Sequence, residues 1–306
     1  MLVYDIQNLT KHYLGQSIPA NDQISLQINQ GEIFGFLGDN GAGKSTLVKQ
    51  MVNLLRPTAG QVLLYGQPVS ANPQVTTLRV GYMPQSWQAL NHLTAGEAIY
   101  FTAHLRGLDR RAAQAERDRL LALWQLEPLR NKVGSRLSGG ERRLLQISIA
   151  MAGNPPILML DEPTNELSPQ RRRQVWNILR DLNRTQGTTI IFITHDAIEA
   201  EKIIQRVGIL HAGRLVALGK PSDLKRQLDQ HLRLELFFAP ETPPTLPTEL
   251  SIQPLGEGRW MVYLERAQLE HVMVNLEQSQ VDDFRLYSAT LEDLYIHYAT
   301  AESDVQ

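Results

Sequence analysis

The sequence predicts an α/β fold with one large and one small domain. Short apolar runs, typical of strands buried in a parallel sheet, alternate with helix-like segments through most of the chain. At 306 residues the chain is too long for one ordinary small domain, and a hydrophobic share of 42% is enough to build a core. We expect a large domain over residues 1–228 and a small C-terminal α+β domain over residues 229–306.

A glycine-rich loop separates the first buried strand, expected over 32–37, from a helix expected over 45–52. Its residues fit the pattern G-x-x-x-x-G-K-[ST] and are Gly38, Asp39, Asn40, Gly41, Ala42, Gly43, Lys44 and Ser45. Glycines let backbone N–H groups approach an anion, and the helix N-terminus adds donors and a favourable dipole. We therefore expect this loop, with Thr46, to bind the phosphates of a nucleoside triphosphate. Lys44 would bridge the β- and γ-phosphates, the Ser45 hydroxyl would bind Mg²⁺, and the Asp39 carboxylate would point to solvent.

An apolar run over 157–160 ends in two adjacent acids, Asp161 and Glu162. The run predicts a strand buried on both faces. Asp161 suits a contact to Mg²⁺, and Glu162 suits a general base or an orienting group for the attacking water. Alone, the two acids could equally form a surface turn. Together with the glycine-rich loop they predict the nucleotide site of a P-loop NTPase core.

A Ser-Gly-Gly segment precedes a helix expected over 141–151, and its residues are Ser138, Gly139, Gly140 and Glu141. Such a segment is usually a flexible turn. At this position before Asp161, it resembles the signature of the ATP-binding cassette (ABC) family, over about residues 1–225. The resemblance implies an ABC ATPase fold with an antiparallel β subdomain and a helical subdomain at about 86–140. It also implies that the signature binds the γ-phosphate of ATP held by an opposite subunit.

The resemblance assigns roles to three further residues. Gln85 matches a glutamine that contacts Mg²⁺ or water and links the core to the helical subdomain. His195, after a strand expected over 188–194, matches a catalytic histidine that contacts the γ-phosphate and holds the attacking water. Tyr13 matches an aromatic residue that stacks on adenine. The plainer alternatives are a glutamine without a role, an inert hydrogen-bonded histidine and a strand-edge tyrosine.

The chain departs from the family pattern just after the two acids. The family usually has Asn-Gly-Leu-Asp-Pro, whereas this chain has Glu166 in place of the glycine and Ser168 in place of the aspartate. Ser168 can still cap a helix whose first residue is Pro169. It lacks a negative charge at the expected dimer interface, and Glu166 is unfavourable where the backbone needs a positive φ. These departures bear on the hydrolysis rate more than on ATP binding.

Composition excludes several classes of function. The net charge of −2 argues against nucleic acid as a partner. Basic runs at 110–111, 142–143 and 171–173 are expected on solvated helix faces. The chain has no cysteine, which excludes disulfides and thiolate metal sites. The N-terminus is unlike a signal peptide, and no apolar stretch approaches the ~20 residues that span a bilayer. We therefore expect a cytoplasmic protein that reaches the membrane through a partner.

Strands in the small domain are expected over 232–237, 259–264 and 284–287, and helices over 268–278 and 290–296, the last with Thr290 as N-cap. This ending resembles the tail of cassette subunits in the ABC-2 class of exporters. A helix that caps a small sheet explains it equally well. In the large domain, residues 2–29 predict antiparallel strands, and residues 206–217 predict a hairpin with its turn at Ala212 and Gly213.

The resemblance implies an ATP-hydrolysing subunit that uses ATP and Mg²⁺ to drive export through an integral membrane permease on a separate chain. It would work as a homodimer or as a heterodimer with a second ABC subunit, with Glu162, His195 and Gln85 as catalytic residues. The alternatives are the ATPase of an importer with a regulatory tail, a soluble ABC ATPase of translation or DNA maintenance, and a catalytically quiet subunit. A single cassette without basic bias disfavours the soluble ATPase, and the small tail domain favours export.

Overall fold

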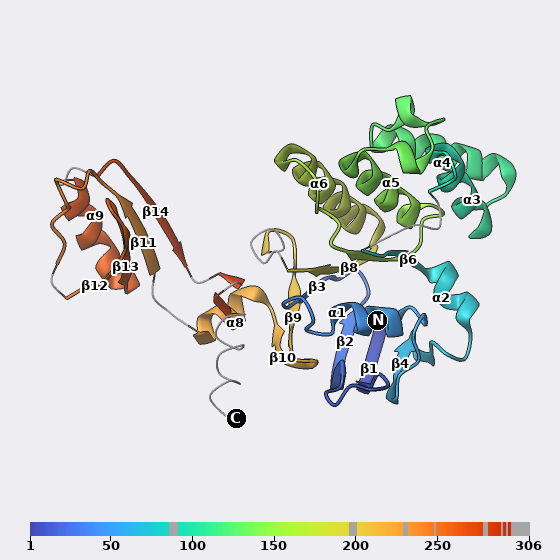
Figure 1. Cartoon of the computed structure of the whole chain (residues 1–306), viewed down its shortest axis with the longest axis horizontal. Coiled ribbons are helices and arrows are strands. Elements are labelled where there is room, and N and C mark those ends of the chain that lie inside the picture. Colours follow the sequence, from blue (N-terminus) through green and yellow to red (C-terminus); the bar gives the residue numbers. More distant parts are fainter. Residues whose placement is uncertain are drawn as a thin grey trace. The chain divides into compact units, whose positions relative to one another are not determined.

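The computed structural model describes residues 1–85, 91–195, 201–228, 232–247, 249–277, 281–288, 290–291 and 293–294. The chain divides into two compact units, Met1–Lys220 and Pro221–Gln306, whose elements are labelled in Figure 1. Both units contain helices and strands, so the expected α/β character is confirmed.

The main sheet of the first unit has six strands in the order β10-β9-β3-β8-β7-β6. Their bounds are β3 (Ile33–Leu37), β6 (Val80–Met83), β7 (Ile157–Asp161), β8 (Thr189–Thr194), β9 (Arg206–His211) and β10 (Arg214–Gly219). All of them pair in parallel except β10, which pairs antiparallel with β9 across the expected turn at Ala212 and Gly213. Every residue of β3, β7 and β8 is buried, in keeping with the apolar residues that make up most of each strand.

A second sheet in this unit is antiparallel, in the order β2-β1-β4-β5, and it confirms the strands expected over 2–29. Its strands are β1 (Leu2–Lys11), β2 (Asn21–Asn29), β4 (Ala59–Leu64) and β5 (Gln67–Pro68). In β2 the alternate residues Ile24, Leu26 and Ile28 are buried. They join one core cluster with Leu47 of the first helix and Phe34 of β3, so this sheet packs directly on the loop-bearing elements.

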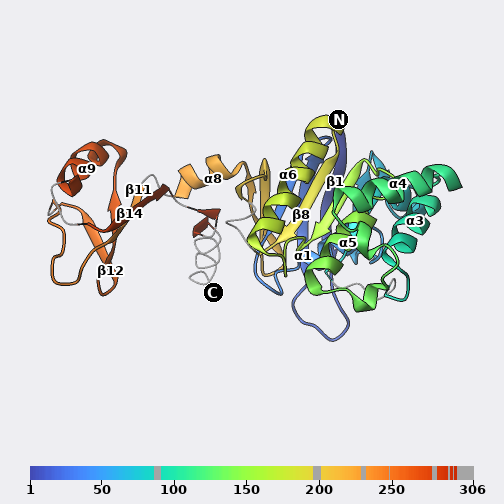
Figure 2. The same cartoon turned by 90° about the horizontal axis from the view of Figure 1, so that it is seen from above.

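The helices of the first unit include α1 (Lys44–Met51), α2 (Pro73–Arg79), α3 (Ala95–Leu105), α4 (Arg110–Leu123), α5 (Gly139–Met151) and α6 (Pro169–Gln186). Short 3₁₀ turns cover Glu127–Leu129 and Gly134–Arg136. Figure 2 shows α3 and α4 together beside α5, in the segment where the helical subdomain is expected, although residues 86–90 lie outside the described residues. Helix α2 was not anticipated; Asn72 caps it and Pro73 occupies its first turn.

The second unit contains a four-stranded antiparallel sheet in the order β12-β13-β11-β14. Its elements include α8 (Pro221–Leu228), β11 (Leu232–Phe237), β12 (Ser251–Gly256), β13 (Arg259–Leu264), a 3₁₀ turn (Arg266–Gln268), α9 (Leu269–Glu277) and β14 (Asp283–Ser288). Leu234 and Val262 pack against Val272 of α9. Of the closing helix expected over 290–296, positions 292 and 295–296 lie outside the described residues. Thr290 is the expected cap: its Oγ1 accepts from the Asp293 amide at 3.2 Å.

Candidate functional site

The candidate site lies at the carboxyl ends of three neighbouring parallel strands. The glycine-rich loop follows β3, Asp161 ends β7 with Glu162 directly after it, and His195 follows β8. Strands β3 and β8 are hydrogen-bonded neighbours, as are β8 and β7. Three segments that are far apart in sequence therefore meet at one edge of the sheet, which is where open α/β sheets bind ligands.

The loop is fixed by close backbone packing at Gly43. Gly43 has φ 97°, and a Cβ atom there would lie 2.2 Å from the Ala20 carbonyl oxygen, so only glycine fits. The Asn21 side-chain amide donates to the Gly43 carbonyl at 3.1 Å and accepts from Gln50 at 2.8 Å. Sequence reasoning missed Asn21, because no motif connects the start of β2 with the loop.

Lys44 lies inside the loop and is 7% exposed. Its Nζ donates to the carbonyl oxygens of Gly38 and Asp39, the latter at 2.8 Å. Burial lowers the pKa of the Lys44 ammonium, and the carboxylates of Glu162, Asp161 and Asp39 oppose that shift. Asp39 is exposed, as expected. The loop thus presents a cation whose present partners are carbonyl groups that a phosphate could replace.

Asp161 and Glu162 are both buried, at 3% and 4% exposure. Burial raises the pKa of Asp161 to about 6, with the Glu162 charge as the next cause. The Ser45 hydroxyl donates to Asp161 Oδ2 at 3.4 Å. These two oxygen ligands fit Mg²⁺, which commonly takes one or two protein ligands and completes its shell with substrate phosphates and water. Among the described residues, no cluster of three or more His, Asp or Glu side chains could hold a metal without such help.

The Glu162 carboxylate is tied to the end of β8. It accepts hydrogen bonds from the Thr194 hydroxyl at 3.2 Å and from the His195 backbone amide at 3.1 Å. His195 Nδ1 lies 2.6 Å from Glu162 Oε1, while the histidine side chain remains 52% exposed. The structure therefore brings Glu162 and His195 into direct contact, with one buried and the other open to solvent.

Ser138 and Glu141 form a capping box at the start of α5. The Ser138 hydroxyl accepts from the Glu141 amide at 3.3 Å, and Glu141 Oε2 accepts from the Ser138 amide at 2.9 Å and from Lys132 Nζ at 3.2 Å. The backbone hydrogen bond from Ser138 is the main cause that lowers the pKa of Glu141. The Glu141 carboxylate thus binds its own segment, while Gly139 and Gly140 form the first turn of the helix.

Arg143 corrects one sequence-based expectation. We expected the 142–143 run on a solvated face, but Arg143 is only 6% exposed. Arg143 lies one turn after Gly139 in α5, on the same face of the helix. Burial lowers the pKa of its guanidinium, and the carboxylates of Glu166, Glu162 and Asp161 oppose that shift. The expectation was wrong because the packing of α5, and not its charge pattern, decides which face is buried.

The other predicted residues lie at the margins of this site. The Tyr13 hydroxyl is 3.4 Å from Thr46 Oγ1, and the ring is 37% exposed. Gln85 is exposed two residues after β6, and within the described ranges it forms no hydrogen bond to the other site residues. The Ser168 hydroxyl caps α6, accepting from the Arg171 amide at 3.4 Å, as expected. Glu166 has φ 65°, so the departure from glycine occurs where the backbone is left-handed.

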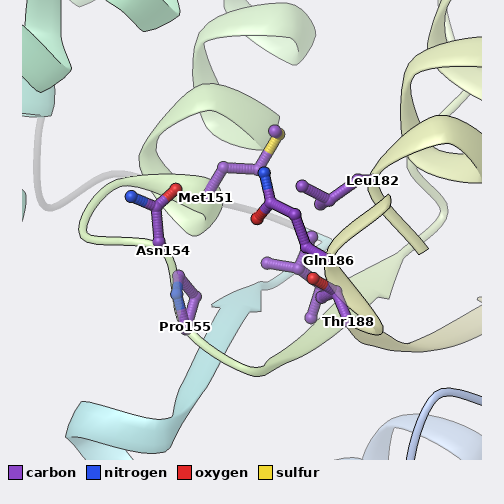
Figure 3. A pocket seen from close by; sticks show the side chains of 7 residues that line it. Met151, Asn154, Pro155, Leu182, Gln186 and Thr188 are labelled. Carbon is purple, nitrogen blue, oxygen red and sulfur yellow. The ribbon is translucent and has the colours of Figure 1, made fainter. Parts of the chain in front are cut away.

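A small pocket lies elsewhere, before the amino-terminal ends of β7 and β8. It is shown in Figure 3 and is lined by Met151, Asn154, Pro155, Leu158, Leu182, Gln186 and Thr188. Asp161 and His195 are at the opposite ends of these two strands. The pocket is therefore distinct from the candidate site. In the part of the chain that the structure describes, no helix has the length and apolar character to cross a membrane.

Comparisons with known proteins agree on one family. A family model described as ABC transporter matches residues 21–165. The Nod factor export ATP-binding protein I of Rhizobium etli is 35% identical over 228 residues, which cover 74% of this chain and 71% of that protein. The methionine import ATP-binding protein MetN of Halalkalibacterium halodurans is 33% identical over 247 residues, which cover 79% of this chain and 73% of that protein.

Longer relatives and solved structures also match. The chain spans 9% to 11% of the length of the retinal-specific phospholipid-transporting ATPases of Mus musculus, Bos taurus and Homo sapiens. Among solved structures, a dimeric ATP-binding cassette in a post-hydrolysis state with ADP and Pi aligns with a TM-score of 0.66. It is 26% identical, and the alignment covers 71% of this chain and 98% of that one.

Proposed function

The chain belongs to the ABC transporter family and carries that family's ATPase cassette, and we propose that it powers substrate export through a separate membrane subunit. The likeness to solved cassettes confirms the expected P-loop NTPase core. The observation that carries the proposal is the meeting of Lys44, Ser45, Asp161, Glu162 and His195 at one edge of the main sheet. The likeness to an ATP-binding protein named for Nod factor export supports export.

Each residue has a role in hydrolysis that follows from its contacts. Lys44 would exchange its carbonyl partners for the β- and γ-phosphates of ATP. Ser45 and Asp161 would hold Mg²⁺, which would supply positive charge to offset the negative charge of the transferred phosphate. Glu162 would accept a proton from the water that attacks the γ-phosphorus, while His195, held by Glu162, contacts the γ-phosphate.

Two copies would meet head to tail, so that Ser138, Gly139 and Gly140 of one copy contact the ATP held by the other. Support comes from the first turn of α5, which offers backbone N–H groups and a favourable dipole to an anion, and from the dimeric cassette that this chain resembles. Tyr13 would stack on adenine, beside Thr46. Gln85, two residues after β6, would link the nucleotide site to the helical subdomain.

The membrane subunit would dock on the helical subdomain. On α3 the side chains of Phe101 and Leu105 are 44% and 81% exposed, which leaves apolar surface for a partner. The chain would then be peripheral on the cytoplasmic face of the membrane, with residues 1–228 as the nucleotide domain and 229–306 as an accessory domain. The second candidate is the ATPase of an importer, favoured by the likeness to a methionine import protein.

The test uses Glu162→Gln, which keeps the size of the side chain and removes the proton acceptor. ATP binding should persist, hydrolysis should fall at least a hundredfold, and a dimer closed on ATP should accumulate. Glu257→Gln makes the same charge change at an exposed hairpin position and should leave the hydrolysis rate unchanged. Hydrolysis by Glu162→Gln at the normal rate would refute the role of Glu162.

Tagged Glu162→Gln protein purified from detergent-solubilised membranes should bring a polytopic membrane protein with it. Recovery with ribosomal or DNA-repair proteins from the soluble fraction alone would overturn the transport proposal. Stimulation of wild-type hydrolysis by a substrate-loaded external binding protein, once the membrane partner is present, would favour the importer.

A further inference from the structure

The turn over residues 162–167 lies against residues 138–141 of the same chain, which we call the signature segment. A Cβ atom built at Gly139 would lie 2.3 Å from Glu166 Oε2, so the carboxylate lies directly on this glycine. A Cβ atom at Gly140 would lie 3.6 Å from both the Glu166 carbonyl oxygen and Leu167 Cδ2. The turn therefore lies close to both glycines of this segment, and its acidic side chain reaches the first of them.

Two features hold a negative charge at this position. The N-terminus of α5 favours an anion through the helix dipole, and Gly139 is in its first turn. The buried guanidinium of Arg143 lies one turn further along the same face of α5. Of the carboxylates whose charges raise the pKa of Arg143 against the effect of burial, Glu166 has the largest effect. Glu166 itself is exposed, so its outer side faces solvent in the single chain. The Glu166 carboxylate would therefore lie on the surface that the second copy approaches in the proposed dimer.

We propose that Glu166 is a positioning residue that holds the signature segment in its own chain and opposes closure on the partner's ATP. The proposal rests on the head-to-tail dimer proposed above. In that dimer the γ-phosphate approaches the same first turn of α5 on which the Glu166 carboxylate lies. Like charges within a few ångströms repel in a site that excludes water, so the carboxylate must withdraw from Gly139 as the two copies close. Glu166 thereby sets the ATP concentration at which the dimer forms.

The experiment measures dimer formation in full-length Glu162→Gln protein, because blocked hydrolysis lets the closed dimer accumulate. ATP with Mg²⁺ is titrated, and the dimer fraction is read by analytical ultracentrifugation. Adding Glu166→Gln removes the charge and keeps the side-chain size. The ATP midpoint should fall about tenfold, equivalent to about 1.4 kcal/mol. Glu166→Gly also removes the charge and relieves the left-handed backbone, and it should shift the midpoint in the same direction.

Three controls separate this role from a general effect on structure. Glu257→Gln in the same background changes net charge equally at an exposed site and should leave the midpoint unchanged. ATP affinity measured on dilute monomer should be the same for all variants, because Glu166 acts on closure. Raising the salt concentration should bring the ATP midpoints of the proteins with and without Glu166→Gln closer together, because salt screens the repulsion between the carboxylate and the γ-phosphate.

An unchanged or raised midpoint in both Glu166 variants, with the dimer still forming, would overturn this inference alone. A Glu162→Gln chain that binds ATP and remains monomeric at every ATP concentration would refute the proposed dimer itself. The two failures are distinguished by the Glu162→Gln protein before any second substitution is made.

Discussion

Arg106 joins three elements of the first unit through its guanidinium group. It follows the last residue of α3, and its Nη1 donates to the carbonyl oxygens of Ala150 at 2.8 Å, Ile149 at 3.3 Å and Ala152 at 2.5 Å. Its Nη2 donates to the Val80 carbonyl at 3.4 Å. Burial lowers the pKa of Arg106 to about 10, so the group is charged at neutral pH. One cation thus serves the last carbonyls of α5 and the start of β6.

We predict that Arg106→Met destabilises the first unit by about 3 kcal/mol. A hydrogen bond to a charged group contributes about 1.5–3 kcal/mol when its partner is buried, and only two of the four bonds here are short. The cation also interacts favourably with the C-terminus of α5, by about 0.3–1 kcal/mol. Methionine retains the apolar stem, so little packing is lost. The predicted loss of about 3 kcal/mol is below the full sum for two short hydrogen bonds and the helix dipole, because the energies of neighbouring bonds to one group are not additive.

The assay is urea unfolding, followed by hydrogen exchange of amides in the last turn of α5. Arg110→Met is the matched control, because Arg110 is exposed in the first turn of α4. The control should change stability by less than about 0.5 kcal/mol. A loss of less than about 1 kcal/mol for Arg106→Met, or no loss of exchange protection in α5, would show that these carbonyls do not depend on the guanidinium.

Three further predictions concern the reaction. Ser168→Asp keeps the cap of α6 and adds a negative charge, and it should raise dimer-coupled ATPase activity in a steady-state phosphate-release assay; an unchanged rate with an intact fold would count against this. His195→Ala should lower kcat about a hundredfold with little change in the affinity for a fluorescent ATP analogue, and a loss confined to affinity would contradict its proposed contact. Chelation of Mg²⁺ should stop phosphate release, and restored Mg²⁺ should recover it; hydrolysis that persists in excess chelator would refute the proposed roles of Ser45 and Asp161.

The sequence predicts the loop and the two acids well, because their chemistry constrains residues that are adjacent in the chain. A phosphate-binding loop needs its glycines and its lysine in one short segment, and that segment is visible without any structure. Arg143 and Asn21 act through packing between distant segments. Arg143 is one of two adjacent arginines, a pattern typical of a solvated helix face, and only the orientation of α5 reveals that it is buried. Asn21 holds Gly43 across 22 positions, and no periodicity marks it.

Elements that lack an apolar pattern were also missed. Every residue of β12 is exposed, and the strand contains Pro254, so neither alternation nor strand propensity identifies it. It is nevertheless an edge strand, paired on one side with β13, where proline is tolerated because only one edge is hydrogen-bonded. Helix α2 is only seven residues long and buries Thr76 alone, so its cap at Asn72 is a stronger signal than its face.

The strained turn between Glu162 and Glu166 explains how one segment can serve two sites. Glu162 has φ 53° and Glu166 has φ 65°, a conformation that costs a residue with a Cβ atom about 1 kcal/mol or more. Thr164 between them is 6% exposed and Leu167 beyond them is 5% exposed, so buried neighbours hold the turn in place. The first left-handed residue directs its carboxylate to His195, and the second directs its carboxylate to Gly139. Because both ends of so short a turn are anchored, a backbone change that frees Glu166 from the signature segment must also act on the carboxylate that would accept the proton from water.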